Sequence, residues 1–245
     1  MSEHGSIVIL TGAGISAESG VDTFRAADGI WAKYDIEEVA TPEAFAGDPL
    51  KVNAFYNARR RQLLSGTIGP NPAHRALAEL QSAWRGRVTL VTQNIDDLHE
   101  RAGSTDVLHM HGELTKVRCT DSERVIEWRR DVTPGERCEC CGMTGTLRPH
   151  VVWFRELPFW LDEATRALRE CDLFMAIGTS GQVYPASGFI DVARASGRAR
   201  TVELNLEPTV LSHLFDENLH GPAGRVVPEF IARLLEQGAG PIQLP

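Results

Sequence analysis

The sequence predicts an α/β fold, in which helices cover a parallel sheet and a smaller domain is inserted. Three observations support this expectation. Short apolar runs rich in β-branched residues alternate with amphipathic stretches, each run leads directly into a polar cluster, and one cysteine-rich segment interrupts the alternation. A chain of 245 residues is long enough for one large domain or for a core with a small insert.

Four apolar runs predict strands that are buried on both faces, as in a parallel sheet: Ile7–Leu10, Val88–Val91, Leu173–Ile177 and Thr201–Leu204. Other stretches carry apolar residues three to four positions apart, a spacing that predicts helices. These stretches are Ala54–Leu64, Asn71–Ala83, Leu161–Glu170, Ala186–Ala195 and Glu229–Glu236.

A polar cluster follows each predicted strand. The clusters are Thr11–Gly14, Thr92–Asp96, Gly178–Ser180 and Asn205–Glu207. In an open parallel sheet, ligands bind outside the carboxyl ends of the strands, so we expect these clusters to form one site. The alternative is that turns are simply polar.

The segment from Lys116 to Leu147 holds four of the five cysteines and predicts an inserted small domain. We expect a main domain of residues 1–115 and 148–245, an insert of residues 116–147, and a second, helical insert near residues 35–70. The last residues, 237–245, are rich in Gly and Pro and predict a loose tail.

Composition excludes several classes of function. Lys and Arg number 25 against 33 Asp and Glu, a net charge of −8, so no broad basic surface is available for nucleic acid. No apolar stretch approaches the roughly 20 residues that span a bilayer, and the N-terminal apolar run is too short for a secretion signal. We expect a cytoplasmic monomer that binds neither nucleic acid nor membrane.

The segment Gly12–Ala17 has the pattern G-x-G-x-x-G/A between a predicted strand and a predicted helix. Such a loop offers backbone N–H groups to a pyrophosphate. A standard dinucleotide fold then needs a second strand ending in an acidic residue, but Phe24–Tyr34 predicts an irregular loop. The sequence therefore disfavours an ordinary hydride-transfer dehydrogenase.

Gln93, Asn94 and Asp96 place an amide pair and a carboxylate at a strand end, within reach of a ribose or an amide-bearing ring. The alternative is that Asp96 only caps a helix. His111 follows a short apolar run and precedes Gly112, which suits a general base with a pKa near neutrality. The other histidines lack this context and rank lower: His4, His74, His99, His109, His150, His213 and His220.

Taken together and in this order, these motifs resemble those of the sirtuins, a family of NAD-dependent protein-lysine deacylases, with the bacterial class III type as the nearest likeness. The motifs are Gly12–Ser16, Phe24-Arg25, Thr92–Asp96, His111-Gly112, Gly178–Ser180 and Asn205. The resemblance runs from Ile7 to about Phe230. It implies a Rossmann-like domain and a small zinc-ribbon domain with the catalytic crevice between them.

The resemblance also implies site residues. His111, Asn94 and Asp96 would be catalytic. Contacts to NAD are implied for Gly12, Ala13, Gly14, Ala17, Phe24, Arg25, Trp31, Gln93, Asn94, Ile95, Asp96, His111, Gly178, Thr179, Ser180, Asn205, Leu206, Glu207 and Ala223. In such a reaction the acyl oxygen attacks the nicotinamide ribose, nicotinamide leaves, and His111 deprotonates a ribose hydroxyl that receives the acyl group. The products are O-acyl-ADP-ribose and free lysine.

Tyr56 and Arg59 share one face of a predicted helix. By spacing alone they belong to a solvated basic surface, because Arg60 and Arg61 follow directly. The resemblance implies instead a clamp for the carboxylate of a succinyl, malonyl or glutaryl group, and small residues at Ala26 and Ala27 would leave room for it. Tyr56, Arg59, Phe154 and Val183 are the expected substrate-binding residues, and the helical insert is expected to line the acyl pocket.

Cys119, Ser122, Cys138 and Cys141 follow the zinc-ribbon spacing C-x2-C-x15-C-x2-C with Ser at the second place. We expect a structural zinc site with Cys119, Cys138 and Cys141 as ligands. Cys140 or a water would complete it, or the ribbon would hold without metal. Cys171 is expected to be a buried structural thiol.

Arg155 stands where the family normally has Gly, in a segment expected to pair with substrate backbone. It would either crowd that groove or contact an acidic substrate. Two other functions use the same NAD crevice, mono-ADP-ribosyl transfer and non-catalytic NAD sensing. The intact Gln93, Asn94, Asp96 and His111 set disfavours a sensor.

Overall fold

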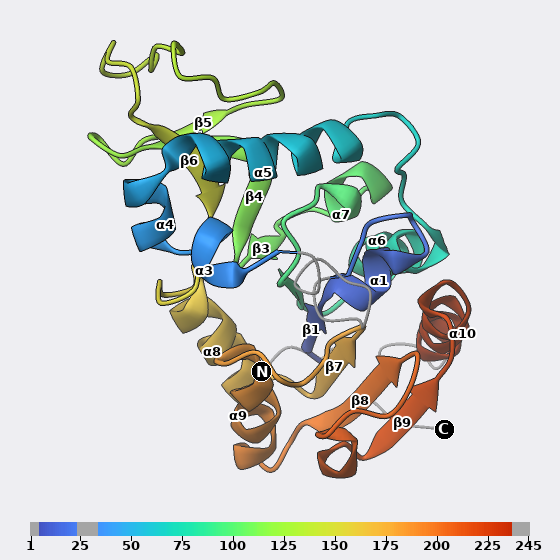
Figure 1. Cartoon of the computed structure of the whole chain (residues 1–245). Coiled ribbons are helices and arrows are strands. Elements are labelled where there is room, and N and C mark those ends of the chain that lie inside the picture. Colours follow the sequence, from blue (N-terminus) through green and yellow to red (C-terminus); the bar gives the residue numbers. More distant parts are fainter. Residues whose placement is uncertain (1–4, 24–33, 237–245) are drawn as a thin grey trace.

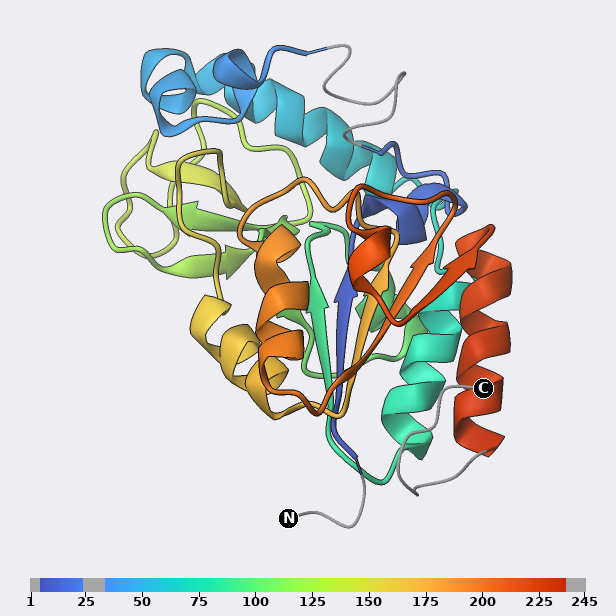
Figure 2. The same ribbon diagram turned by 90° about the horizontal axis from the view of Figure 1, so that it is seen from below.

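The central sheet has six parallel strands in the order β3-β2-β1-β7-β8-β9 (Figures 1 and 2). The structure is a computed structural model that describes residues 5–23 and 34–236. The strands are β1 (Ile7–Thr11), β2 (Val88–Thr92), β3 (Leu108–His109), β7 (Leu173–Ile177), β8 (Arg200–Asn205) and β9 (Glu217–His220). The predicted α/β class with a parallel sheet is confirmed.

Helices cover both faces of this sheet, and the side chains of β1 show why. Ile7 and Ile9 pack against one group of helices, whereas Val8 and Leu10 pack against the other. The first group is α6 (Pro72–Ala83) and α10 (Ala223–Glu236), and the second is α8 (Leu161–Glu170) and α9 (Phe189–Ala195), on the opposite side in Figure 2. A strand that is apolar on both faces requires such a double cover.

A second, antiparallel sheet lies beyond the carboxyl edge in the order β5-β4-β6 (Figure 1). Its strands are β4 (Gly112–Cys119), β5 (Val125–Glu127) and β6 (Leu147–Val151). It therefore begins and ends a few residues outside the expected insert of residues 116–147, and those domain limits remain a prediction.

Three helices of the second insert pack against this small sheet: α3 (Ile36–Val39), α4 (Pro42–Gly47) and α5 (Pro49–Leu63). Asn57 on α5 links the two parts, because its amide donates to the Val132 carbonyl and accepts from the Val132 N–H, both at 2.9 Å. Arg60 adds a bond from Nε to the Leu114 carbonyl at 2.8 Å. Arg60 is therefore a buried structural residue and not part of a solvated basic face.

Several helix limits differ from the sequence prediction. Helix α5 begins at Pro49 and not at Ala54, because Asp48 caps it by accepting from the Lys51 N–H and proline suits the first turn. Helix α10 begins at Ala223 and continues through Pro228. The stretch Ala186–Ala195 divides into η1 (Ala186–Gly188) and α9.

Three short elements complete the described part. Helices α1 (Ala13–Ala17) and α7 (Leu98–Ala102) follow β1 and β2, and η2 (Ser212–Leu214) lies between β8 and β9. None of the helices in residues 5–23 and 34–236 is long and apolar enough to span a bilayer. The predicted irregular loop, apart from Tyr34, and the predicted tail both lie outside the described residues.

Candidate active site

The polar clusters that follow the strands meet at the carboxyl edge of the main sheet. Asn94, after β2, donates from Nδ2 to the Gly12 carbonyl and to the Ser16 hydroxyl, each at 3.1 Å. Asn205, the last residue of β8, donates to the Thr179 carbonyl at 2.6 Å. Each side chain thus ties the end of its strand to the turn that follows a neighbouring strand.

The glycine loop after β1 packs directly on the turn after β7. A Cβ atom on Gly14 would lie 2.7 Å from Gly178 Cα, and Gly178 itself has a φ of +62°, so both positions need glycine. Gly12 and Gly14 donate their N–H groups to the carbonyls of Ile177 and Gly178. These two amides therefore hold the two turns together, and the expected contacts of the loop with a pyrophosphate remain a prediction.

Asp96 lies beneath this loop with only 6% of its surface exposed. Its carboxylate accepts from the Ser16 hydroxyl at 3.0 Å and from the Leu98 N–H at 3.1 Å. Burial raises the pKa of Asp96 to about 6, although these hydrogen bonds lower it. The cap alternative is correct in part, because Asp96 accepts from the first residue of α7 while its other oxygen faces Ser16.

His111 follows β3 at the same edge. Its Nδ1 lies 2.9 Å from the Gln93 carbonyl, which can only accept, so Nδ1 carries the proton and Nε2 keeps a lone pair. Burial lowers the pKa of His111, and the imidazole is therefore neutral at pH 7. A neutral ring with a free Nε2 is the form that a general base requires.

Two buried histidines that ranked lower in the sequence contact the hydroxyl groups next to this site. His99 lies 3.0 Å from the Thr11 hydroxyl, and His74 lies 3.4 Å from the Ser16 hydroxyl. Burial lowers the pKa of His74 to about 4 and that of His99 well below its usual range, so both are neutral. The sequence signal that could have identified them is a histidine on the apolar face of a helix.

His109, at the end of β3, contacts the loop that holds Asn94. Its Nδ1 lies 3.3 Å from the Asn94 carbonyl and its Nε2 lies 2.7 Å from the Glu100 carboxylate. Burial lowers the pKa of His109, but the Glu100 contact outweighs burial and the pKa is raised. His109 therefore holds the backbone at Asn94 through a charge-assisted contact.

A pocket of about 530 Å³ opens beside Asn94 and Asp96. Its wall also includes Ala13 and Ile95 from the main domain, Leu114 from β4, and Arg59 from α5. Arg59 thus lines the same cavity as two of the candidate catalytic residues, whereas His111 is not among the residues of its wall. Tyr56 is 3% exposed, and its hydroxyl accepts from Trp153 Nε1 at 3.1 Å.

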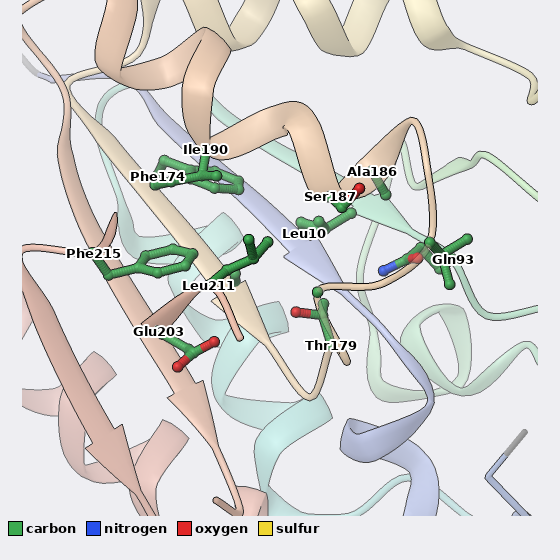
Figure 3. Close-up of a pocket in the computed structure, with 13 residues that line it drawn as sticks. Leu10, Gln93, Phe174, Thr179, Ala186, Ser187, Ile190, Glu203, Leu211 and Phe215 are labelled. Atoms are coloured by element: carbon green, nitrogen blue, oxygen red, sulfur yellow. The ribbon is translucent and has the colours of Figure 1, made fainter. Parts of the chain in front are cut away.

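A second pocket, of about 340 Å³, lies between β7, β8 and α9 (Figure 3). Gln93, Thr179 and Val183 border it, and Phe174, Ile190 and Phe215 form its apolar side. Glu203 lies at the end away from Gln93 in Figure 3 and is paired with the hydroxyls of Thr209 and Ser212. Val183 and Arg59, both expected at the substrate, therefore line different pockets.

The remaining predicted residues are more scattered. Ala17 is exposed at the end of α1, Leu206 and Glu207 are exposed after β8, and Ala223 is the first residue of α10. Ser180 is half-buried in the turn after β7. Phe24, Arg25 and Trp31, together with Ala26 and Ala27, lie outside the described residues.

Arg155 makes ion pairs within the chain, and its two expected effects on a bound peptide remain predictions. Its guanidinium pairs with Glu37 on α3 at 2.8 Å and with Glu43 on α4 at 3.2 Å. The residue has a φ of +75°, a conformation that favours glycine. Beside it, the Phe154 N–H donates to the Ala40 carbonyl at 3.0 Å, so this segment is fastened to the helical insert.

Four cysteines gather in the small domain. The sulfur atoms of Cys119, Cys138, Cys140 and Cys141 all lie within 4.8 Å of one another. Cys140, and not Ser122, is thus the fourth member of the cysteine cluster. The Ser122 hydroxyl lies 3.1 Å from the Cys140 sulfur. Cys171 is buried in the main domain and contacts the Leu168 carbonyl, as expected of a structural thiol.

Comparison with known proteins gives consistent matches. The model of the Sir2 family matches residues 12–185. NAD-dependent protein deacylases of Escherichia coli (strain K12) and Salmonella typhimurium are 59% and 56% identical over 234 and 236 residues. Each alignment covers 96% of this chain, and 84% and 86% of those proteins.

Solved structures match along nearly the whole chain as well. A complex of a Sir2 homologue with NAD is 41% identical with a TM-score of 0.85, covering 96% of this chain and 91% of that one. A complex of Sir2 with a p53 peptide and NAD+ is 29% identical with a TM-score of 0.76, covering 95% and 92%.

The buried carboxyl of Asp96 should make stability fall as pH rises. Its pKa is 3.8 unfolded and about 6 folded, so the folded state holds the extra proton between these values. The shift corresponds to about 3 kcal/mol. We therefore expect the free energy of unfolding of Asp96→Asn in urea, relative to that of the parent protein, to rise by about 2–3 kcal/mol between about pH 4 and pH 7.

Asp172→Asn is the matched control. Burial raises the pKa of Asp172, but bonds from Ser6 and Arg198 outweigh burial and lower it. Its difference from the parent should therefore change with pH in the opposite direction. A pH-independent difference for Asp96→Asn would contradict the assignment of a raised pKa.

Proposed function

The chain belongs to the Sir2 family, and we propose that it is an NAD-dependent deacylase that removes acyl groups from lysine side chains of proteins. The observation that carries the proposal is the neutral His111 at the same sheet edge as Asn94 and Asp96. The deacylase names of the relatives support deacylation over ADP-ribosyl transfer or sensing. The complex with a p53 peptide and NAD+ supports a lysine-bearing peptide as substrate.

NAD would be consumed as a co-substrate and would supply a ribose carbon from which nicotinamide leaves. The residues that fit it are the turn at Gly12–Gly14, the turn at Gly178–Ser180 and Asn205, which close the carboxyl edge of the sheet. Asn94, held by Gly12 and Ser16, and Asp96 would orient the reacting ribose. His111 Nε2 would take a proton from a ribose hydroxyl as the acyl group moves to the oxygen of that hydroxyl.

His111→Ala tests this assignment. The variant should bind NAD almost as well as the parent but turn over roughly 10²–10⁴-fold more slowly, the usual loss when a general base is removed. Mass spectrometry with NAD and acyl-lysine peptides should detect O-acyl-ADP-ribose from the parent protein. ADP-ribosylated protein in its place, or a wild-type rate in the variant, would contradict the proposal.

We also propose that the acyl pocket accepts acyl groups that end in a carboxylate, such as succinyl and malonyl, besides acetyl. Arg59 supports this, because it lines the pocket with Asn94 and Asp96 while its Nε is buried and has no hydrogen-bond partner. Its guanidinium carbon lies 3.3 Å from the centre of the Phe55 ring and 4.9 Å from the centre of the Tyr34 ring. A fixed cation with an unused donor matches a carboxylate that must leave water.

Arg59→Met combined with Tyr56→Phe should separate a carboxylate clamp from a structural pair. We expect kcat/KM for a succinyl-lysine peptide to fall. The loss should correspond to about 2–5 kcal/mol of transition-state stabilisation, the scale for an unpaired buried charge. Deacetylation needs no partner for a carboxylate and should fall far less. A parallel fall of both activities would mean that the pair supports the fold or catalysis in general.

A structural zinc ion held by Cys119, Cys138, Cys140 and Cys141 completes the proposal. Four sulfur atoms so close together have the donor chemistry and the number that tetrahedral zinc requires. They also bring together the β4 end and the loop before β6, and two of them, Cys119 and Cys138, belong to the small domain's own core of six buried residues. Metal binding would therefore contribute directly to its stability.

Metal analysis of protein purified without chelator should give about one zinc per chain, and a chelator should lower the melting temperature. Cys140→Ser should lose most of the bound metal, because the sequence leaves Ser122 where a cysteine is usual. Cys171→Ser, at a buried thiol far from the cluster, is the control and should retain it. Protein without zinc, or full retention in Cys140→Ser, would contradict the four-cysteine site.

A further inference from the structure

Trp153 donates a hydrogen bond to the side chain that the acyl pocket needs as a donor. Its Nε1 lies 3.1 Å from the Tyr56 hydroxyl, and both residues are almost fully buried. An indole N–H can only donate, so the tyrosine oxygen must accept in this bond. The hydroxyl hydrogen of Tyr56 therefore points away from Trp153.

That hydrogen has no acceptor in the part of the chain that the structure describes, where the Trp153 indole is the one hydrogen-bond partner of the Tyr56 hydroxyl. A buried donor without an acceptor is unfavourable, and the arrival of an acceptor relieves this cost. Burial raises the pKa of the Tyr56 phenol, so the hydroxyl keeps its proton. Leu63, Ile95 and Leu114, which pack in the same cluster as Tyr56, line the pocket that holds Arg59.

The indole itself is held rigidly. The Arg148 guanidinium lies 3.5 Å above the Trp153 ring, and Phe45 packs against the ring at 5.2 Å. Glu156 fixes Arg148 through two hydrogen bonds of 2.8 and 2.9 Å. Glu156 also accepts a hydrogen bond from the backbone N–H of Trp153 at 2.8 Å. The direction of the indole N–H is thus set by a buried, charge-assisted network.

We propose that Trp153 is a positioning residue for acyl specificity, which turns the Tyr56 hydroxyl so that it donates to the carboxylate of an acidic acyl group. The inference rests on the proposed deacylase function and assigns to Trp153 no contact with substrate. Without the indole N–H, the tyrosine oxygen loses its donor partner and the hydroxyl is free to rotate. An acidic acyl group then has to order it, whereas an acetyl group does not use it.

The test compares Trp153→Phe with the parent on three peptides that differ only in the acyl-lysine: succinyl, its neutral succinamoyl analogue, and acetyl. We expect kcat/KM for the succinyl peptide to fall about tenfold, the scale of one hydrogen bond to a charged group, chiefly through a higher KM. The ratio of succinyl to succinamoyl activity should fall with it. In a Tyr56→Phe background, Trp153→Phe should leave that ratio unchanged.

Two further variants control for folding. Trp84→Phe removes another buried indole N–H, which donates to the Gly5 carbonyl at 2.8 Å away from the site, and should leave the ratio as in the parent. Trp153→His retains a ring N–H, because imidazole Nε2 occupies the same place in its ring as indole Nε1. It should therefore recover part of the succinyl preference, and it tests the inference if Trp153→Phe does not fold.

The outcomes are distinguishable. A parent protein that deacetylates but shows no preference for succinyl over succinamoyl would refute both the carboxylate clamp and the role of Trp153. A parent with that preference and a Trp153→Phe variant that keeps it would refute the inference alone. An equal effect of Trp153→Phe with and without the Tyr56 hydroxyl would also overturn it, since the indole would then act by some other route.

Discussion

The contact between Asn94 and the loop after β1 is the interaction on which the site depends. One amide group bonds to the Gly12 carbonyl and the Ser16 hydroxyl, and Ser16 in turn bonds to Asp96. The carboxyl ends of β1 and β2 are therefore locked together as one polar unit. This lock is available only because β1 is the middle of a parallel sheet, buried on both faces, so that its end cannot move away from its neighbours.

Burial then sets the charge state of the groups around this unit. Asp96 has a raised pKa, whereas His74, His99 and His111 have lowered pKa values, and in each case burial is the largest cause. The three imidazoles are therefore neutral at pH 7. Polar groups that are neutral and already hydrogen-bonded can line a water-poor crevice without a large desolvation cost, while His111 keeps a lone pair for chemistry.

The pocket beside Asn94 and Asp96 is completed by the helical insert and the small sheet. Its cation comes from α5, its apolar wall comes partly from β4, and the indole behind Tyr56 follows β6. Arg148 and Glu156 hold that indole, and Arg155 ties the same segment to α3 and α4. These contacts form a network separate from that of Asn94, Ser16 and Asp96, and the proposed acyl selectivity and the proposed catalysis would depend on one network each.

Much of this architecture could be predicted from local sequence. The four predicted strands match β1, β2, β7 and β8 to within one residue at each end, because burial on both faces demands continuous apolar runs. The motifs at the carboxyl ends also follow from residues close in the chain. The cysteine-rich segment indicated a small inserted domain, but its antiparallel strands were not predicted. Helix starts were less predictable, since a cap such as Asp48 acts without any apolar signal.

What only the tertiary structure decided concerns residues that are distant in sequence. Cys140 joins the other three cysteines because the β4 end and the loop before β6 fold onto each other, which the spacing left open. The pairing of Trp153 with Tyr56 spans 97 positions, and the partners of Arg155 come from two helices more than 100 residues away. The sequence by itself determined which short segments are apolar, polar or ligand-like. The partners of its buried polar groups depended on packing. A hydrogen bond requires two groups to lie within about 3 Å, and these groups come from segments that no common sequence pattern connects.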